Sequence, residues 1–307
     1  MAASKQPRPS WMPSEESGSG EGPPVVLVPG GLSGWVSWEP HAAILARRHK
    51  VIRVQLLNMA AAEKGEGPGE GYSLRAESEA LGRTLDGLEV DRVHLVGWSH
   101  GGAVALDYAL EHPDRLASLT LIEPAAYWVA RSYGEFADEV RSYEELFRSF
   151  HDPPTEDDLI AFLKKNGLVP PGKDPRKMPR WPVWRKLRVA LSSLHTVIEH
   201  DDDIRRIRSL RNVPVLLVRG RESTGLNAGG VELIARGLGP MTRTIALPDG
   251  HASHIVAMDR FLAELEDFLG DAACWECPEV PAPGAGQEGL TSASPPTRPA
   301  RARSRRT

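Results

Sequence analysis

A single serine lies among glycines in the segment Gly-Trp-Ser-His-Gly-Gly at residues 97–102. The apolar run before it, residues 93–96, is typical of a strand, and the small-residue run after it, residues 103–110, is typical of a helix. Glycines on both sides allow a sharp turn from strand to helix, which would hold the Ser99 hydroxyl clear of the sheet. The backbone N–H of His100 would then lie at a helix N-terminus, where developing negative charge is stabilised. The pattern therefore predicts a nucleophilic serine.

A nucleophilic serine needs a base within hydrogen-bond reach, and with this kind of turn the base follows later in the chain, after an acid. The segment Ala-Leu-Pro-Asp-Gly-His-Ala-Ser-His at residues 246–254 follows the last apolar run typical of a strand. We expect His251 to be the base, with His254 as the alternative, although His254 is expected within or next to the final helix. His94 lies inside a predicted strand, where we expect it to face the core or the sheet.

Two glutamates could orient the base. Glu123 ends one predicted strand in Leu-Thr-Leu-Ile-Glu-Pro, and Glu222 follows the next in Leu-Leu-Val-Arg-Gly-Arg-Glu. Carboxyl ends of parallel strands share one edge of a sheet, so either carboxylate could reach the histidine. We favour Glu123, because Pro124 ends its strand and fixes the chain that follows, and Glu222 stays open.

The elements that would position these residues alternate along the chain. Short apolar runs typical of buried strands occupy residues 25–28, 51–54, 93–96, 119–122, 215–218 and 244–247. Helix-like segments separate most of them, which predicts an α/β fold with a mostly parallel sheet of about six strands and helices on both faces. After the first run, glycines at Gly30 and Gly31 allow close backbone approach to a substrate, so Gly31 or Leu32 is the expected second oxyanion donor beside His100.

The alternation also divides the chain. We expect a disordered N-terminal tail over residues 1–22, a core formed by residues 23–126 and 213–270, and a disordered C-terminal tail over residues 271–307. Residues 127–212 contain no convincing strand, which predicts a helical lid over the strand ends.

The lid carries most of the expected substrate contacts. Tyr127 and Trp128 follow Glu123 most closely and are the predicted pocket walls, and Trp98 is expected beside the substrate because it precedes the nucleophile. The basic segment 173–188 is interpreted as a solvated helix face.

These motifs together resemble the α/β-hydrolase fold family over about residues 23–270. The segment 97–102 looks like the family's nucleophile elbow, residues 248–254 like its histidine loop, and residues 28–38 like its oxyanion loop, with Pro29 in place of a usual histidine. Glu222 matches the usual position of the acid, and Glu123 matches one that some members use. The family's first two antiparallel strands have no counterpart before Pro23.

The resemblance implies acyl chemistry through an acyl-enzyme on Ser99. We therefore expect a serine hydrolase that cleaves an ester, thioester or lactone of a small to medium organic substrate. Acyl transfer or cyclisation at the same residues, or ligand binding without catalysis, are the alternatives, because a fold does not choose a reaction.

Composition sets the remaining expectations. The 307 residues are 41% hydrophobic and carry a formal net charge of −4, which does not favour nucleic-acid binding. No apolar run suits a membrane span or a signal peptide, so we expect a cytoplasmic protein. No metal-ligand spacing or phosphate loop appears, so no metal or cofactor is expected, only a small-molecule substrate. Cys274 and Cys277 lack a second pair for zinc, and the arginine-rich end reads as a solvated tail.

Overall fold

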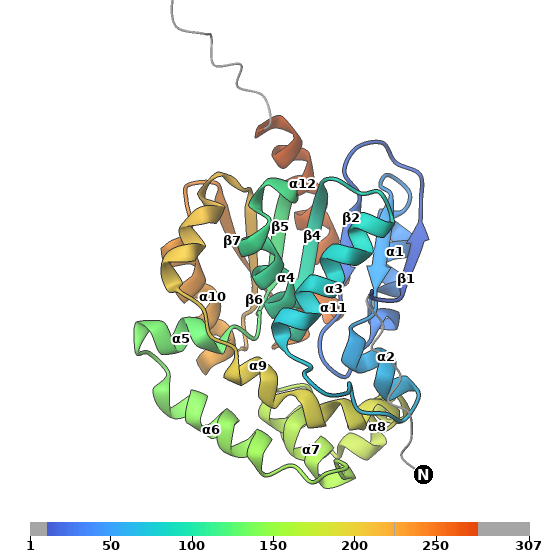
Figure 1. Cartoon of the computed structure of the whole chain (residues 1–307), viewed down its shortest axis with the longest axis vertical. Coiled ribbons are helices and arrows are strands. Elements are labelled where there is room, and N and C mark those ends of the chain that lie inside the picture. The colour runs from blue at the N-terminus through green and yellow to red at the C-terminus, as the bar shows by residue number, and fades with distance from the viewer. Residues whose placement is uncertain (1–10, 224, 276–307) are drawn as a thin grey trace, which may run out of the picture. The chain divides into compact units, whose positions relative to one another are not determined.

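A central sheet organises the chain (Figure 1). The computed structural model describes residues 11–223 and 225–275. Within them, seven strands lie in the order β1-β3-β2-β4-β5-β6-β7. The strands are β1 Ser14–Ser17, β2 Val25–Val28, β3 Val51–Val54, β4 Val93–Trp98, β5 Leu116–Ile122, β6 Val215–Gly220 and β7 Thr242–Leu247. Every neighbouring pair is parallel except β1 with β3, which confirms the predicted α/β class.

The first strand was not expected. Strand β1 pairs antiparallel with β3, with Glu15 opposite Arg53, so the sheet has one strand more than the six or so expected, and residues 14–17 belong to the sheet instead of a structureless tail. Its sequence, Ser-Glu-Glu-Ser, is mostly exposed and carries no apolar alternation, because an edge strand can pair through its backbone alone. Met12, just before it, is buried and donates its N–H to the Thr84 hydroxyl at 2.7 Å, which fixes the segment on the core.

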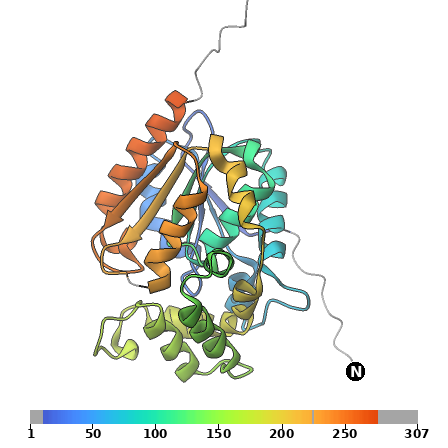
Figure 2. The same cartoon turned by 90° about the vertical axis from the view of Figure 1, so that its left-hand side faces the viewer.

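Helices cover both faces of the sheet, as Figures 1 and 2 show. The core helices are α1 Glu39–Leu45, α2 Leu57–Glu63, α3 Leu74–Gly87, α4 His100–Glu111, α10 Gly225–Gly237, α11 Ser253–Val256 and α12 Met258–Trp275, with 3₁₀ turns η1 Trp35–Trp38 and η2 Pro113–Arg115. Side chains of β2 alternate between two apolar clusters: Val26 and Val28 pack with α3 and α4, and Val25 and Leu27 pack with α1 and α12. Buried on both faces, the strand reads as a continuous apolar run.

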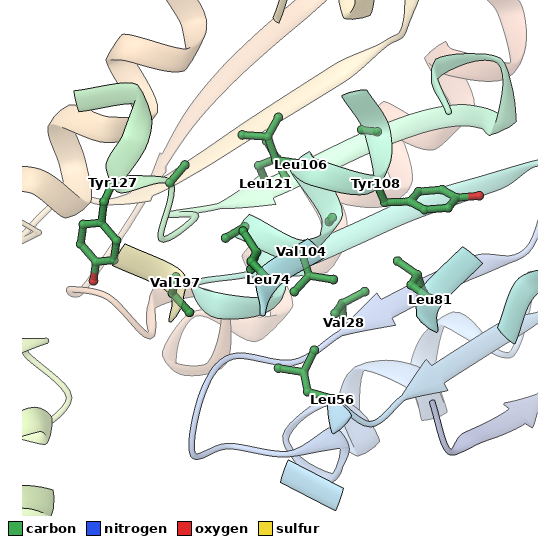
Figure 3. Packing of buried hydrophobic residues seen from close by; sticks show 14 of the residues in the cluster. Val28, Leu56, Leu74, Leu81, Val104, Leu106, Tyr108, Leu121, Tyr127 and Val197 are labelled. Carbon is green, nitrogen blue, oxygen red and sulfur yellow. The ribbon is translucent and has the colours of Figure 1, made fainter. Parts of the chain in front are cut away.

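Helices also fill the whole interval between β5 and β6, here called the insertion. They are α5 Tyr127–Tyr133, α6 Ala137–Arg148, α7 Glu156–Lys165, α8 Trp181–Leu187 and α9 His195–Glu199, with 3₁₀ turns η3 Pro175–Lys177, η4 Arg188–Ser193 and η5 Ile204–Asn212. Figures 1 and 2 show α5 to α9 gathered at one end of the sheet. The core cluster is continuous from Val104 and Leu121 to Tyr127 and Val197 of the insertion (Figure 3).

The last helix runs further than the sequence suggested. Helix α12 continues to Trp275, so it includes Cys274, whereas Cys277 and the arginine-rich end lie outside the described residues. The apolar face of α12 includes Phe261 and Phe268, which are fully buried against the sheet. Across the described ranges, no helix is both long and apolar enough to cross a membrane.

Candidate active site

The turn at Ser99 holds a non-glycine residue in a strained backbone conformation. Ser99 links β4 to α4 with φ 52° and ψ −116°, a conformation that costs a non-glycine residue about 1–3 kcal/mol. A side chain at Gly97 would lie 2.5 Å from the carbonyl oxygen of Gly101, and one at Gly101 would lie 2.3 Å from that of Pro29. The glycines are therefore required by close backbone approach, and the strained turn aims the Ser99 side chain out of the sheet.

A hydrogen-bonded chain of three side chains starts at this serine. Nε2 of His251 lies 3.0 Å from the Ser99 hydroxyl, and Nδ1 of His251 lies 2.7 Å from Oε2 of Glu123. Ser99 follows β4, Glu123 follows β5 and His251 follows β7, so the carboxyl ends of three strands bring them together. The histidine and the glutamate are buried. This arrangement can remove the proton of Ser99 and stabilise the imidazolium that results.

Glu123 is held ionised. Its other oxygen, Oε1, accepts the backbone N–H of Gly220 at 2.6 Å. Burial opposes ionisation, but the hydrogen bond from His251, the charge of that histidine and the Gly220 N–H outweigh it, and the pKa of the carboxyl lies below its ordinary value. An ionised carboxylate is what an orienting acid must supply.

Glu222, the other predicted acid, lies at the protein surface. Its side chain is exposed and lines a surface groove, and its backbone N–H donates to the carbonyl oxygen of Asp249. The structure therefore does not support Glu222 as the partner of His251. Glu123 reaches the histidine because its backbone turns sharply after β5, at φ 38°.

The loop that carries His251 is anchored at both ends. The indole N–H of Trp98 donates to the carbonyl oxygen of His251 at 2.9 Å, and Nε2 of His41 donates to that of His254 at 3.0 Å. His254 itself lies in α11, with its ring 4.5 Å from the Trp98 ring, and burial keeps its pKa well below the ordinary value. Trp98 and His41 thus position the loop, and His254 is a buried neutral residue behind it.

The other histidine that the sequence raised lies in the sheet. His94 of β4 is buried, and its Nδ1 is 2.8 Å from the Ser118 hydroxyl on β5. Burial lowers its pKa to about 4. The expectation of a core histidine is confirmed.

Gly31 and Leu32 form a tight turn beside the nucleophile. A side chain at Gly30 would lie 2.6 Å from the Trp98 ring, so the loop passes directly over that residue. Leu32 has φ 59° and is fully buried. In the described part of the chain the backbone N–H groups of Gly31 and Leu32 donate to no backbone acceptor.

A small cavity adjoins Ser99, and it is here called the inner cavity. Its apolar wall comes mostly from the insertion: Tyr127, Phe147, Phe162, Leu194 and Val197. Its polar lining comes from Ser99, His100 and Asn166. Of the predicted contacts, Gly31, His100 and Tyr127 line the cavity. Trp98, Trp128 and Leu32 do not, because all three side chains are packed into the core.

A wider groove opens on the other side of His251, and it is here called the outer groove. It lies between the loop 249–252 and residues 164–178 of the insertion. Asn166 lines both the groove and the inner cavity, whereas Ser99 lines the cavity and His251 lines the groove. The groove is lined by charged residues of both signs, among them Lys164, Lys173 and Glu222.

One cluster has the residue types of a metal site. Ligand atoms of Asp107, His200 and Asp202 lie within 4.8 Å of one another. Arginines already occupy these carboxylates: Arg75 lies 3.2 Å from Asp107, and Arg206 lies 2.7 Å from Asp202. The guanidinium groups compete with a cation for the same oxygens, so we interpret the cluster as an ion-pair network that joins α4 to the end of the insertion.

The sequence and the fold of the chain are similar to those of known hydrolases. A family profile described as alpha/beta hydrolase fold matches residues 23–256. The 2-hydroxy-6-oxo-2,4-heptadienoate hydrolase of Pseudomonas putida is 30% identical over 66% of this chain and 73% of its own. The pimeloyl-[acyl-carrier protein] methyl ester esterase of Aeromonas hydrophila is 28% identical over 82% of this chain and 97% of its own. Among solved structures, a hydrolase from Pseudomonas aeruginosa PA01 shares the fold, with a TM-score of 0.66 and 24% identity over 84% of this chain and 93% of that one.

Proposed function

The chain belongs to the α/β hydrolase fold family and is an enzyme of that family, and on this premise we propose that it is a serine hydrolase acting on an ester, thioester or lactone. The hydrogen-bonded chain from Ser99 through His251 to Glu123 carries the proposal. Acyl transfer to serine needs a base on the hydroxyl and an acid on the base, and these atoms are within reach of each other.

The reaction would run in two halves. Nε2 of His251 takes the proton of Ser99 as its oxygen attacks the carbonyl carbon, and Glu123 stabilises the imidazolium. The N–H of His100 and that of Gly31 or Leu32 bind the oxyanion. His251 gives this proton to the leaving group. It then takes a proton from the water that attacks the acyl-enzyme and returns it to the Ser99 oxygen as the acid is released.

We assign the two parts of the substrate to the two spaces beside Ser99 and His251. The leaving group must lie on the side of the protonated His251, which is where the outer groove opens. The acyl group then lies in the inner cavity, which is closed by aromatic side chains of the insertion. The insertion would therefore act as a lid that limits the acyl group, while the groove admits a larger alcohol or thiol.

The lining of the inner cavity favours an uncharged acyl group. No lysine or arginine is among the described residues that line it, so a carboxylate held there would lack a charged partner. One relative is named for an oxo acid and another for a methyl ester, and the uncharged lining favours the ester.

Turnover with matched serine variants tests the proposal. The purified chain is assayed with short 4-nitrophenyl esters, thioesters and lactones, with Ser99→Ala as the test and Ser149→Ala, an exposed serine on α6's C-terminal side, as the control. We expect turnover that Ser149→Ala retains and Ser99→Ala loses. Turnover that survives in a folded Ser99→Ala variant contradicts the proposal, and product formed only with an added acyl acceptor identifies transfer instead of hydrolysis.

A further inference from the structure

The side chain after the nucleophile has an unusual environment. His100 is buried, and both its ring nitrogens lack a hydrogen-bond partner among the residues that the structure describes. Burial lowers its pKa to about 4, so the ring is neutral near pH 7 and offers one N–H donor and one acceptor nitrogen. A buried donor or acceptor without a partner costs folding free energy, so such a group calls for an explanation.

Two other buried histidines of the described chain each have a partner for one ring nitrogen. His94 bonds the Ser118 hydroxyl, and His41 bonds the carbonyl oxygen of His254. His100, in contrast, has a partner for neither ring nitrogen.

The position of His100 indicates what its partner would be. The ring lines the inner cavity together with Ser99, and a side chain placed on Gly31 would lie 3.9 Å from its Nδ1. It therefore lies beside the expected oxyanion loop, at the end of the cavity where a scissile carbonyl would bind. Phe147, Phe162 and Leu194 of the wall are apolar and offer it no hydrogen bond, and the polar lining residues Asn166 and Tyr127 are not hydrogen-bonded to it.

We propose that His100 is a specificity-determining residue that hydrogen-bonds a keto or hydroxyl oxygen on the acyl part of the substrate, near the scissile carbonyl. The preferred substrates are then short oxo- or hydroxyacyl esters or thioesters. This proposal rests on acyl chemistry at Ser99.

A matched substrate series tests it. Butanoyl thioesters of N-acetylcysteamine are compared with their 2-, 3- and 4-oxygenated counterparts, so that the leaving group stays constant. Wild-type enzyme should favour at least one oxygenated member by about tenfold or more in kcat/KM, the range expected when a buried polar group gains its partner.

Two substitutions assign that preference to the imidazole. His100→Phe keeps a ring and removes both nitrogens, and it should bring the ratio of oxygenated to plain substrate close to one. His100→Gln restores a donor and an acceptor and should recover part of the preference. Because each ratio is taken within one variant, a general loss of activity cancels. A wild-type ratio within about twofold of one at every position, or a tenfold preference that survives His100→Phe, overturns the proposal.

A binding measurement tests the role of His100 independently of the proposed hydrolysis. Calorimetry measures the affinity of Ser99→Ala for the same thioesters, with and without His100→Phe. If no thioester is hydrolysed but the oxygenated one still binds more tightly through His100, the hydrolase proposal fails and the assignment of His100 stands. Equal affinities in both backgrounds overturn the assignment.

Discussion

Replacing Glu123 by glutamine should abolish most of the turnover while leaving the fold intact. The glutamine oxygen can still accept the N–H of Gly220, so the hydrogen bond of 2.6 Å is conserved. What changes is the partner of His251: a neutral amide replaces a carboxylate at 2.7 Å from Nδ1. An amide nitrogen facing Nδ1 also favours the wrong tautomer of the histidine.

The magnitude follows from the charge that the carboxylate supplies. Opposite unit charges about 4 Å apart interact by about 4 kcal/mol at an effective dielectric constant of about 20. Since about 1.4 kcal/mol corresponds to tenfold in rate, losing this stabilisation of the imidazolium should lower kcat by about 10³-fold. The change of tautomer adds to the loss.

The assay compares kcat for 4-nitrophenyl butanoate in Glu123→Gln and Glu222→Gln, with the melting temperature of each variant measured alongside. Glu222 is exposed, so its variant should keep kcat within about threefold of wild type, as surface changes usually leave a protein's energetics within about 0.5 kcal/mol. A folded Glu123→Gln enzyme that retains a tenth of wild-type kcat refutes the reasoning. A large loss in Glu222→Gln alone would assign the acid to the other glutamate.

Three further predictions concern stability and substrate size. Burial raises the pKa of Glu77 from 4.5 to about 7, so between these pH values its carboxyl is protonated in the folded chain and ionised in the unfolded chain. The free energy of unfolding should therefore fall by up to about 3 kcal/mol as pH rises through this window. Denaturant titrations at several pH values should show a weaker dependence of this free energy on pH for Glu77→Gln. Gly97→Ala places a carbon 2.5 Å from the Gly101 oxygen and should lower the free energy of unfolding by about 1–3 kcal/mol, whereas Gly230→Ala, with open space around it, should not; equal melting temperatures would contradict this. Phe162→Ala removes one aromatic wall of the inner cavity and should shift the best acyl chain of an ester series to a greater length; an unchanged optimum would place the acyl group elsewhere.

Much of the sheet could be predicted because its strands are buried on both faces. The runs at 25–28, 51–54 and 215–218 are continuously apolar, and each lies within a strand. Strand β1 could not be found in this way, since its residues are polar and exposed and only its backbone pairing with β3 defines it. The insertion was recognisable by its lack of strand pattern.

The site was predictable where backbone constraints dictate the residue types. Glycines at the Ser99 turn and the position of His251 after a strand follow from the sequence. The choice between Glu123 and Glu222 did not, because they follow neighbouring strands and only the direction of the chain after β5 brings one carboxylate to the histidine. The roles of Trp128 and His100 depend on packing that the sequence does not reveal. Trp128 is packed into the core, and the lack of a hydrogen-bond partner for the His100 ring is seen only in the structure.

The central claim is that Ser99 is a nucleophile activated by His251, and covalent labelling tests it most directly. The chain is treated with a fluorophosphonate, and intact mass and peptide mapping locate the adduct. We expect one adduct per chain on Ser99, formed more slowly in Glu123→Gln and absent from Ser99→Ala. Labelling of Ser99→Ala to the same extent as wild type, or an adduct on another residue of the wild-type chain, would contradict it.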